Sequence, residues 1–351
     1  MQEISSLFVY FFSSFCFSVC IFSLFLWLQF YTSGFFRRTR KERGREESFQ
    51  SIFFRFGGAL AFLIFFFSII GNSHLVFTPD IFGLFLGAVA IFVLGTWDDV
   101  KPIFWKWQLY WQCVIVFFTV FLANIQIASI PSLFGEGRIF FVNEWEFLGY
   151  AFAFFWFLLV MNSLNWIDGV DGLAPGIIVL SGISIAAVSL RPEVFQPPIF
   201  LLAGILCAIF FGLWLFNIHP AKIISGTTGV FVSGFILAYL SLYAGAKLAT
   251  LFLVLALPIL DVFRVIFWRI ILWKPCAMPD KNHIHHTLLM KGWNTKYVVF
   301  FLLCVVALSS FVTLILETRG KILALFFLGI LFFGGILYEY RERTKNKTPV
   351  S

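Results

Sequence analysis

The stretch Asn162-Ser-Leu-Asn165-Trp-Ile-Asp168-Gly-Val-Asp171-Gly-Leu-Ala174 places two carboxamides, two carboxylates and two glycines between two long apolar runs. Amide and carboxylate side chains are costly beside hydrocarbon and are rare there without a functional role. Repeated Asp-Gly steps let the backbone turn sharply and present oxygen atoms to a cation or a nucleotide. The alternative is a polar turn in which an Asp caps the helix that starts at Leu173. The density of Asn and Asp side chains favours metal-assisted chemistry at a membrane surface.

The composition around this stretch indicates a membrane protein. The chain has 351 residues, of which 60% are hydrophobic and 12% are charged, whereas a soluble domain has about 25% charged residues. We therefore expect one integral-membrane domain over residues 1–351, with the abundant Phe residues packed between helices or facing lipid. The net charge of +7 suits a surface of anionic lipid better than nucleic acid, because the cations are spread over several loops.

Apolar runs define the predicted fold, since a helix that crosses a bilayer needs about 20 apolar residues. The sequence predicts an all-α, polytopic helical bundle with about eleven transmembrane helices. The predicted spans are residues 6–31, 52–71, 78–97, 109–128, 148–164, 174–190, 197–216, 228–243, 248–271, 297–316 and 321–339.

Positive charges between the predicted spans indicate the orientation of the chain. The loop after the first span carries Arg37, Arg38, Arg40, Lys41, Arg43 and Arg45. If this loop is cytoplasmic, alternation of the spans places most of the 25 Lys and Arg residues on the same side. We therefore expect the N-terminus outside and the C-terminus in the cytoplasm. The same alternation places the polar clusters near 98–107, 162–174, 217–230 and 274–296 on the cytoplasmic face, where nucleotides are available.

An adjacent pair of carboxylates, Asp98 and Asp99, follows the third predicted span. Such a pair can bind Mg²⁺ or hold one proton between its two members, and a solvated helix terminus is the plain alternative. Lys106, a few residues downstream, could meet a phosphate group as a point charge. Its alternative role is to extend from the helix end to the membrane surface.

Two further polar clusters lie between later spans. Gly226-Thr227-Thr228-Gly229 could bring backbone N–H groups close to phosphate at a helix start, and a plain interhelical turn fits equally well. Asp261 and Arg264 are three residues apart and can pair on one helix face, either as a structural ion pair or within a site. His283-Ile-His285-His286 lacks the Cys or Glu partners of a convincing zinc site. Imidazoles that contact a substrate's sugar and phosphate are therefore the preferred interpretation.

Taken together, these clusters resemble the polyprenyl-phosphate N-acetylhexosamine-1-phosphate transferases, glycosyltransferase family 4. The resemblance is strongest over residues 55–289, and the ordered set of motifs is highly specific although each motif alone is not. The motifs are Arg55-Phe-Gly57-Gly58, the segment from Gly95 to Gln112, the segment from Asn162 to Ala174, Pro220-Ala221-Lys222, and the segment from Asp280 to Leu288. The His-x-His-His run is similar to the bacterial undecaprenyl-phosphate N-acetylglucosamine-1-phosphate branch, whereas the muramoyl-pentapeptide branch tends to carry three consecutive His.

The resemblance implies transfer of N-acetylhexosamine-1-phosphate, with GlcNAc-1-phosphate as the preferred group, from a UDP-sugar to undecaprenyl phosphate. UMP would be released as the by-product, and the protein would lie in the bacterial inner membrane. The lipid-linked product would initiate a cell-envelope polysaccharide such as O-antigen or teichoic acid. The implied cofactor is Mg²⁺, with Mn²⁺ as an alternative. Whether the protein forms a homodimer is left open by the sequence.

The resemblance also implies roles for individual residues. The implied catalytic residues are Asp98, Asp99, Asp168 and Asp171. The implied substrate-binding residues are Lys106, Asn162, Arg264, His283, His285 and His286. The implied metal ligands are Asn165, Asp168 and, more weakly, Thr227.

Two departures from the family pattern bear on activity. The family's Gly-Asp-x-Gly-Ser motif aligns with the segment from Gly226 to Val230, so Thr227 stands where relatives carry a catalytic or metal-binding Asp, and Val230 replaces Ser. The early Arg-x-x-His-x-x-Pro pattern before Arg55 is also not evident. The main alternative is therefore a catalytically impaired homologue that binds lipid phosphate or UDP-sugar without turnover. A transporter with midplane polar sites is disfavoured, because the polar residues gather at one face.

Overall fold

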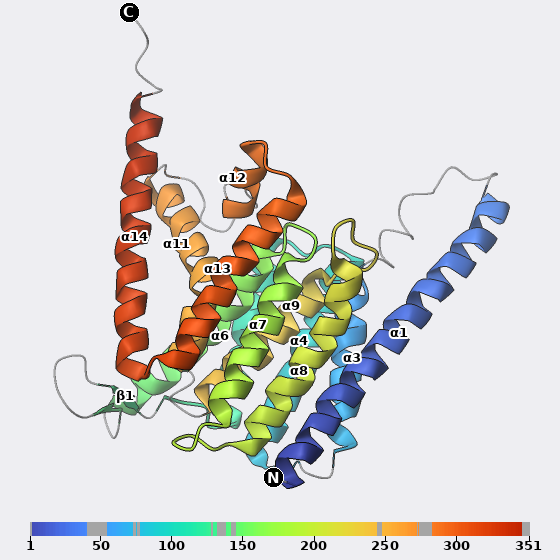
Figure 1. Cartoon of the computed structure of the whole chain (residues 1–351), viewed down its shortest axis with the longest axis horizontal. Helices are drawn as coiled ribbons and strands as arrows, with labels where there is room; N and C mark the ends of the chain where they lie inside the picture. Colours follow the sequence, from blue (N-terminus) through green and yellow to red (C-terminus); the bar gives the residue numbers. More distant parts are fainter. Residues whose placement is uncertain are drawn as a thin grey trace, which may run out of the picture.

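The computed structural model describes residues 2–40, 55–72, 75, 78–127, 129–131, 138–141, 145–243, 248–271, 273 and 283–345. Its helices are α1 (Gln2–Arg40), α3 (Gly57–Ile70), α4 (Pro79–Val100), α5 (Trp105–Leu122), α6 (Glu146–Ile167), α7 (Leu173–Ser189), α8 (Pro197–Asn217), α9 (Gly226–Leu242), α10 (Leu248–Val254), α11 (Ala256–Ile271), α12 (Ile284–Met290), α13 (Thr295–Ile315) and α14 (Thr318–Lys345). Two short strands, β1 (Ser129–Pro131) and β2 (Arg138–Phe140), pair antiparallel between α5 and α6. The sequence analysis placed no strand there, and this small sheet is the one departure from helix among the described elements (Figure 1).

Local capping signals determine where several helices begin. Thr78 precedes α4, and its hydroxyl oxygen accepts the N–H of Ile81 at 3.5 Å, while Pro79 occupies the first helical position. Asn294 precedes α13 and accepts the N–H of Lys296 at 3.0 Å. These side chains satisfy backbone donors that have no partner within the helix.

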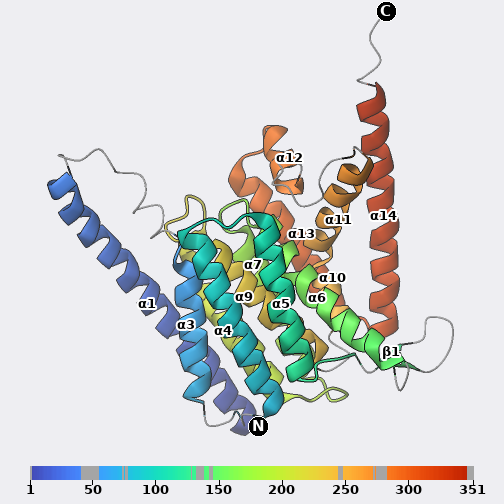
Figure 2. The ribbon, with the colours of Figure 1, turned by 180° about the vertical axis from the view of Figure 1, so that it is seen from behind.

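Helix α9 lies at the centre of the bundle and packs against α3, α4 and α6 (Figures 1 and 2). Its side chains are buried along nearly the whole helix. Helix α3 crosses it closely, because the N–H of Gly58 donates to the carbonyl of Ser225 at 2.9 Å. A Cβ atom on Gly58 would overlap the backbone of Gly229, so only a residue without a side chain permits this approach.

The predicted span 248–271 is bent rather than continuous. Helices α10 and α11 meet at an angle of 69°. Pro258 has no N–H to donate to the carbonyl of Val254, where α10 ends, and its ring crowds that carbonyl. The bend sends α11, which carries Asp261, alongside α13 and α14 (Figure 1).

The structure supports a polytopic membrane bundle. Six of the described helices are long and apolar enough to cross a membrane, namely those at Val9–Leu28, Ile81–Val100, Glu146–Ile167, Pro197–Asn217, Thr295–Ile315 and Thr318–Gly335. The bent pair α10 and α11 would make a seventh span, and α3, α7 and α9 are shorter apolar helices. Every predicted span coincides with a helix or with the bent pair. That eleven of them cross the membrane stays a prediction, as does their orientation.

Candidate active site

The two carboxylates at the end of α4 hold the first turn of α9. Asp99 is buried and accepts the N–H of Thr227 at 2.7 Å, the N–H of Thr228 at 3.0 Å and the hydroxyl of Thr228 at 2.6 Å. Asp98 accepts the hydroxyl of Thr227 at 2.7 Å and the N–H of Ile103 at 2.8 Å. A carboxylate at a helix N-terminus satisfies unpaired N–H groups and interacts favourably with the helix dipole. Asp99 therefore has a clear structural role in addition to its expected catalytic one.

Gly226 lets the end of α4, which carries Asp99, come close to the first turn of α9. Its φ is +64°, in the left-handed region that favours glycine. A Cβ atom at this position would lie 2.6 Å from Oδ2 of Asp99 and 2.7 Å from its Oδ1. A side chain there would push the carboxylate away from α9, so the glycine of this motif serves the contact with Asp99.

The turn that follows α6 carries Asp168 at the helix end, with Asp171 close by. Part of Asp168 reaches solvent, but surrounding protein atoms desolvate its carboxyl group. That desolvation, together with the negative charges of Asp99 and Asp171, raises the pKa of Asp168 to about 7. The three carboxylates therefore influence one another, and the structure brings the α4 cluster and the α6–α7 turn into one electrostatic environment.

Asp171 ties the α6–α7 turn to the segment after α8. Its Oδ2 accepts the N–H of Ala221 at 3.1 Å and lies 2.8 Å from Nδ1 of His219. The side chain of Asn217 is buried between the same segments, where its Oδ1 accepts the N–H of Gly172 at 2.7 Å. Gly172 has a φ of +85° and precedes α7. Backbone and side-chain contacts together fix the shape of the turn.

The amide side chains of this stretch differ in what they contact. Asn162 lies one helical turn before Asn165, and its Nδ2 donates to Oε1 of Gln112 on α5 at 2.7 Å and to the carbonyl of Leu158 at 2.8 Å. Asn165 is partly exposed near the end of α6. Asn162 therefore couples α6 to α5, which leaves Asn165 as the better placed of the two amides for a ligand.

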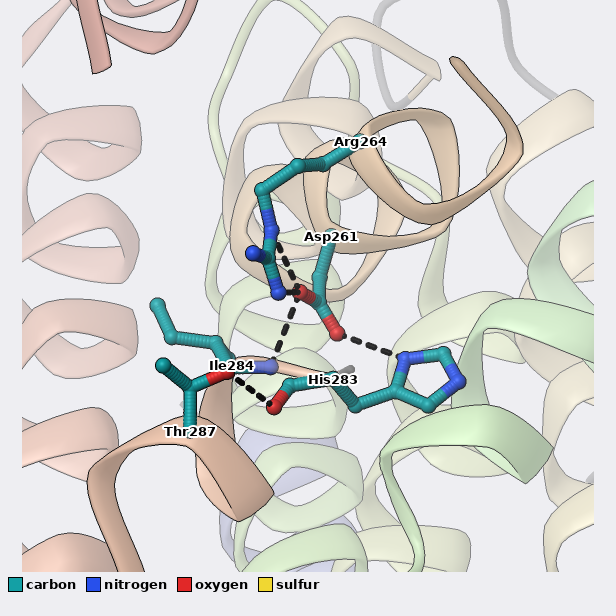
Figure 3. Close-up of polar contacts among 5 residues, drawn as sticks. All are labelled: Asp261, Arg264, His283, Ile284 and Thr287. Carbon is teal, nitrogen blue, oxygen red and sulfur yellow. Dashed lines mark hydrogen bonds and ion pairs between the residues drawn. The ribbon is translucent and has the colours of Figure 1, made fainter. Parts of the chain in front are cut away.

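A second polar cluster connects α11 with the start of α12 (Figure 3). Asp261 is buried, and its Oδ1 accepts Nη2 of Arg264 at 2.9 Å and the N–H of Ile284 at 3.0 Å. Its Oδ2 lies 2.8 Å from Nδ1 of His283. The ion pair that the spacing of Asp261 and Arg264 predicted is confirmed. Arg264 thus shares its charge with Asp261.

His285 joins the two polar clusters. Its ring lies parallel to that of His283, with the two ring centroids 5.8 Å apart. The centroid of the His286 ring lies 4.2 Å from that of the His285 ring. A Cβ atom at Gly169 would overlap Nε2 of His285, so the ring lies directly against the turn that follows Asp168. Burial, with the charges of His286 and His283 as smaller causes, lowers the pKa of His285 to about 3. His285 is therefore neutral at physiological pH.

The comparisons with known proteins agree on one family. Residues 81–245 match the model for glycosyl transferase family 4. Over 255 residues the chain is 32% identical to a probable undecaprenyl-phosphate N-acetylglucosaminyl 1-phosphate transferase of Bacillus subtilis, an alignment that covers 70% of this chain and 68% of the relative. The chain belongs to glycosyl transferase family 4.

Other relatives in the family differ in their stated substrates. An undecaprenyl-phosphate alpha-N-acetylglucosaminyl 1-phosphate transferase of Yersinia pestis is 25% identical over 274 residues, 72% of each chain. A phospho-N-acetylmuramoyl-pentapeptide-transferase of Dictyoglomus thermophilum is 34% identical over 155 residues, which are 43% of this chain and 48% of the relative. The region that matches the family model contains the α4, α6–α7 and α9 clusters and ends before the histidine cluster.

Most of the site residues expected in this family member gather at one end of the bundle. Hydrogen bonds join Asp98 and Asp99 to the first turn of α9, the charges of Asp99 and Asp171 act on Asp168, and His285 lies against Gly169, the residue after Asp168. Lys106 is exposed, and its Nζ lies 5.6 Å from the ring centroid of Trp105. That placement fits a lysine at the rim of the site or at the membrane surface. Asp280 lies outside the described residues.

Sequence reasoning placed three supporting residues in polar clusters but assigned them no role in the site. His219, Asn217 and Thr228 contact the motif residues across long stretches of sequence. Asn217 and His219 stood in a polar turn that was too short to signal a role. Their pairing with the Asp-Gly stretch required the fold, because Asp171 and His219 are 48 residues apart.

The donor atoms at this end fit a hard divalent cation whose coordination is completed by substrate. Among the residues that the structure describes, no group of three His, Cys, Asp or Glu side chains is placed to hold a metal ion by itself. Mg²⁺ is commonly held by one or two carboxylates together with substrate phosphates. Burial and, to a smaller extent, the charges of Asp99 and Asp171 raise the pKa of Asp168, and a bound cation would favour its ionised form. The residues therefore suit a metal that arrives with a diphosphate.

Proposed function

We propose that this chain transfers GlcNAc-1-phosphate from UDP-GlcNAc to undecaprenyl phosphate and releases UMP. The observation that carries the proposal is the meeting of four family aspartates and three histidines at one end of an apolar bundle. The names of the Bacillus and Yersinia relatives support the choice of sugar and lipid. The product would begin a bacterial cell-envelope polysaccharide.

The reaction forms one P–O bond and breaks another. A phosphate oxygen of the lipid attacks the β-phosphorus of the UDP-sugar, the bond from that phosphorus to the oxygen of UMP breaks, and UMP leaves with the bonding electrons. The lipid retains a diphosphate that bears the sugar. Phosphoryl transfer depends chiefly on positioning and on the stabilisation of charge, and a lipid phosphate at neutral pH needs little deprotonation. Asp98 would steady the attacking phosphate or accept its remaining proton.

Mg²⁺, when bound, would neutralise charge that develops on the diphosphate. Asp168 and Asn165 are the residues we expect to hold it, with Thr227 as a weak further ligand, and Mn²⁺ could take the same place. Thr227 can contribute only a neutral oxygen, and its hydroxyl already donates to Asp98. Asp171, paired with His219, would keep the turn in shape for the nucleotide.

The histidine cluster would position the sugar and diphosphate from the other side. His283 and His286 flank the neutral His285. Arg264 and Lys106 would offset phosphate charge, Arg264 from its pair with Asp261 and Lys106 from the rim. The site would face the cytoplasm of a bacterial inner membrane, with the N-terminus of the chain outside and the C-terminus inside.

The test is UMP release by purified protein in detergent or nanodiscs. The assay supplies undecaprenyl phosphate, Mg²⁺ and, in separate reactions, UDP-GlcNAc, UDP-GalNAc and UDP-MurNAc-pentapeptide. We expect UMP and a lipid-linked diphosphate sugar with UDP-GlcNAc, and neither product when the lipid is omitted. Fastest turnover with UDP-MurNAc-pentapeptide would refute the choice of sugar, and release of UMP without lipid would refute the choice of acceptor.

A second candidate function follows from Thr227. Since the family's Asp is missing here, the chain could bind UDP-GlcNAc or lipid phosphate without turnover. Isothermal titration with UDP-GlcNAc separates the two functions. Micromolar binding without UMP release at any Mg²⁺ concentration would favour the binding protein, whereas measurable turnover would exclude it.

A further inference from the structure

Asp261 has more contacts than an ordinary helix-surface carboxylate. Its side chain is 3% exposed and is contacted by Arg264, His283 and the backbone of Ile284. His283 is 22 residues away along the chain and itself only 8% exposed at the side chain. A buried carboxylate persists where paired charge and hydrogen bonds compensate for lost hydration. Arg264 supplies a positive charge at Oδ1, and His283 adds a hydrogen bond at Oδ2, so the compensation of Asp261 also holds the imidazole in place.

The chemistry of this contact determines which nitrogen of His283 carries a proton. An ionised carboxylate can only accept hydrogen bonds, so Nδ1 of His283 must donate to Oδ2 of Asp261. In the neutral ring, Nε2 is then left with its lone pair, and in the protonated ring Nε2 becomes a charged donor. Figure 3 shows Nε2 pointing away from Asp261.

The surroundings fix the direction of the ring as well as its tautomer. The indole of Trp166, near the end of α6, meets the imidazole of His283 edge-on with centroids 5.6 Å apart. The parallel ring of His285 lies beyond, against Gly169. The N–H of Ile284 is bound to the same carboxylate, so the first turn of α12 cannot rotate without breaking the contact.

We propose that Asp261 is a positioning residue for the transfer reaction, which fixes His283 as the Nδ1–H tautomer and presents its Nε2, as a hydrogen-bond acceptor, to a hydroxyl group of the bound sugar. The proposal rests on the proposed function for the identity of the ligand. Asp261 itself touches no substrate. It acts through His283, in the way that carboxylates behind ligating histidines fix the tautomer and orient the ring.

The first test reads the tautomer directly and needs no activity. Protein labelled with ¹⁵N-histidine, in nanodiscs at pH 8, gives distinct chemical shifts for protonated and unprotonated ring nitrogens. The chain has five His residues, and the signal that disappears in His283→Gln belongs to His283. We expect a protonated Nδ1 and an unprotonated Nε2. A neutral ring with its proton on Nε2 would overturn the inference.

The second test removes the carboxylate while keeping its shape. In Asp261→Asn the amide nitrogen can face Nδ1 of His283, which favours the other tautomer. We expect that switch in the spectrum and a fall in kcat of about 10–100-fold, the usual effect of losing a partner behind a functional histidine. The KM for UDP-GlcNAc should change less than kcat. Asp261→Glu, which restores a carboxylate, should recover part of the lost rate.

Thr287→Val provides the matched control. The Thr287 hydroxyl donates to the carbonyl of His283 at 3.1 Å, so its loss disturbs the same turn without touching the imidazole. A loss of kcat in Thr287→Val equal to that in Asp261→Asn would reduce Asp261 to a structural role and overturn the proposal. So would a loss in Asp261→Asn that adds fully to the loss in His283→Gln, because a partner acting only through His283 cannot add to its removal.

The proposed function and this inference can fail separately. A wild-type protein that releases no UMP with any lipid and UDP-sugar refutes the function. In that case the tautomer of His283, and its change in Asp261→Asn, still decide whether Asp261 controls the ring. If Asp261→Asn does not fold, the tautomer of His283 in the wild-type spectrum decides alone, with a proton on Nδ1 supporting the inference and a proton on Nε2 overturning it.

Discussion

Replacement of Asp99 by Asn should destabilise the protein as well as inactivate it. Asp99 is 4% exposed and accepts three hydrogen bonds from the first turn of α9. Asn keeps one oxygen and sets an NH₂ group against N–H donors, so at least one buried donor loses its partner at a cost of about 1–3 kcal/mol. Loss of the negative charge at the N-terminus of α9 adds about 0.5–1 kcal/mol. We expect the free energy of unfolding to fall by about 2–4 kcal/mol.

The assay is reversible unfolding in mixed micelles, followed by tryptophan fluorescence, with no nucleotide and with EDTA present. Asp98→Asn is the control, because among the described residues Asp98 accepts only the N–H of Ile103 and a hydroxyl that can rotate to donate elsewhere. We expect that variant to lose about 1 kcal/mol. If Asp99→Asn is as stable as the parent and loses only turnover, the carboxylate is not needed to hold α9, and the reasoning is wrong.

Three other outcomes can be measured. Asp168→Asn should abolish most UMP release, and turnover like that of the parent would remove Asp168 from the catalytic residues. Thr227→Asp should lower the Mg²⁺ concentration for half-maximal turnover, or create activity where the parent has none. In EDTA it should lower the free energy of unfolding, because the new carboxylate faces Asp98. If neither the Mg²⁺ requirement nor the stability changes, position 227 is not a ligand. The unfolded chain protonates His285 near pH 6.5 but the folded protein only near pH 3, so the free energy of unfolding should fall as pH drops below about 6.5, by about 2 kcal/mol at pH 5. His285→Gln should lack that part of the pH dependence, and identical pH profiles would contradict the neutral, buried ring.

The apolar runs were sufficient to locate the long helices, because hydrocarbon-compatible length leaves few choices of boundary, but the short helix α12 (Ile284–Met290) lies outside every predicted run. The prediction of 197–216 is close to α8 (Pro197–Asn217). The run 248–271 concealed a bend, since periodicity and hydropathy carry no signal for the angle between two helices. Pro258 was the one local sign of it.

The candidate site was predicted in its residue types but not in its partnerships. Asp99, Asp168 and His285 were all chosen from motifs; in the structure the charge of Asp99 acts on Asp168, and His285 lies against Gly169. The contact between Asp98 and Thr227 joins residues 129 positions apart, and no local rule can anticipate it. The sequence treated Asp261 as the partner of Arg264, three residues on, because helix spacing reveals that pair. The bond to His283 depends on how the chain returns after α11, which spacing does not encode.

The attachment of the histidines to α11 has a consequence for how specificity can change. Asp98, Asp99, Asp168 and Asp171 lie within residues 81–245, which match the family model, whereas His283, directly before α12, is bonded to Asp261 on α11. The two halves meet where His285 rests on Gly169. A chimera that exchanges residues 256–290 with those of a relative would replace His283 together with its partner Asp261. If the histidines contact the sugar as we propose, this exchange would change the sugar preference and leave the aspartates of residues 81–245 as they are.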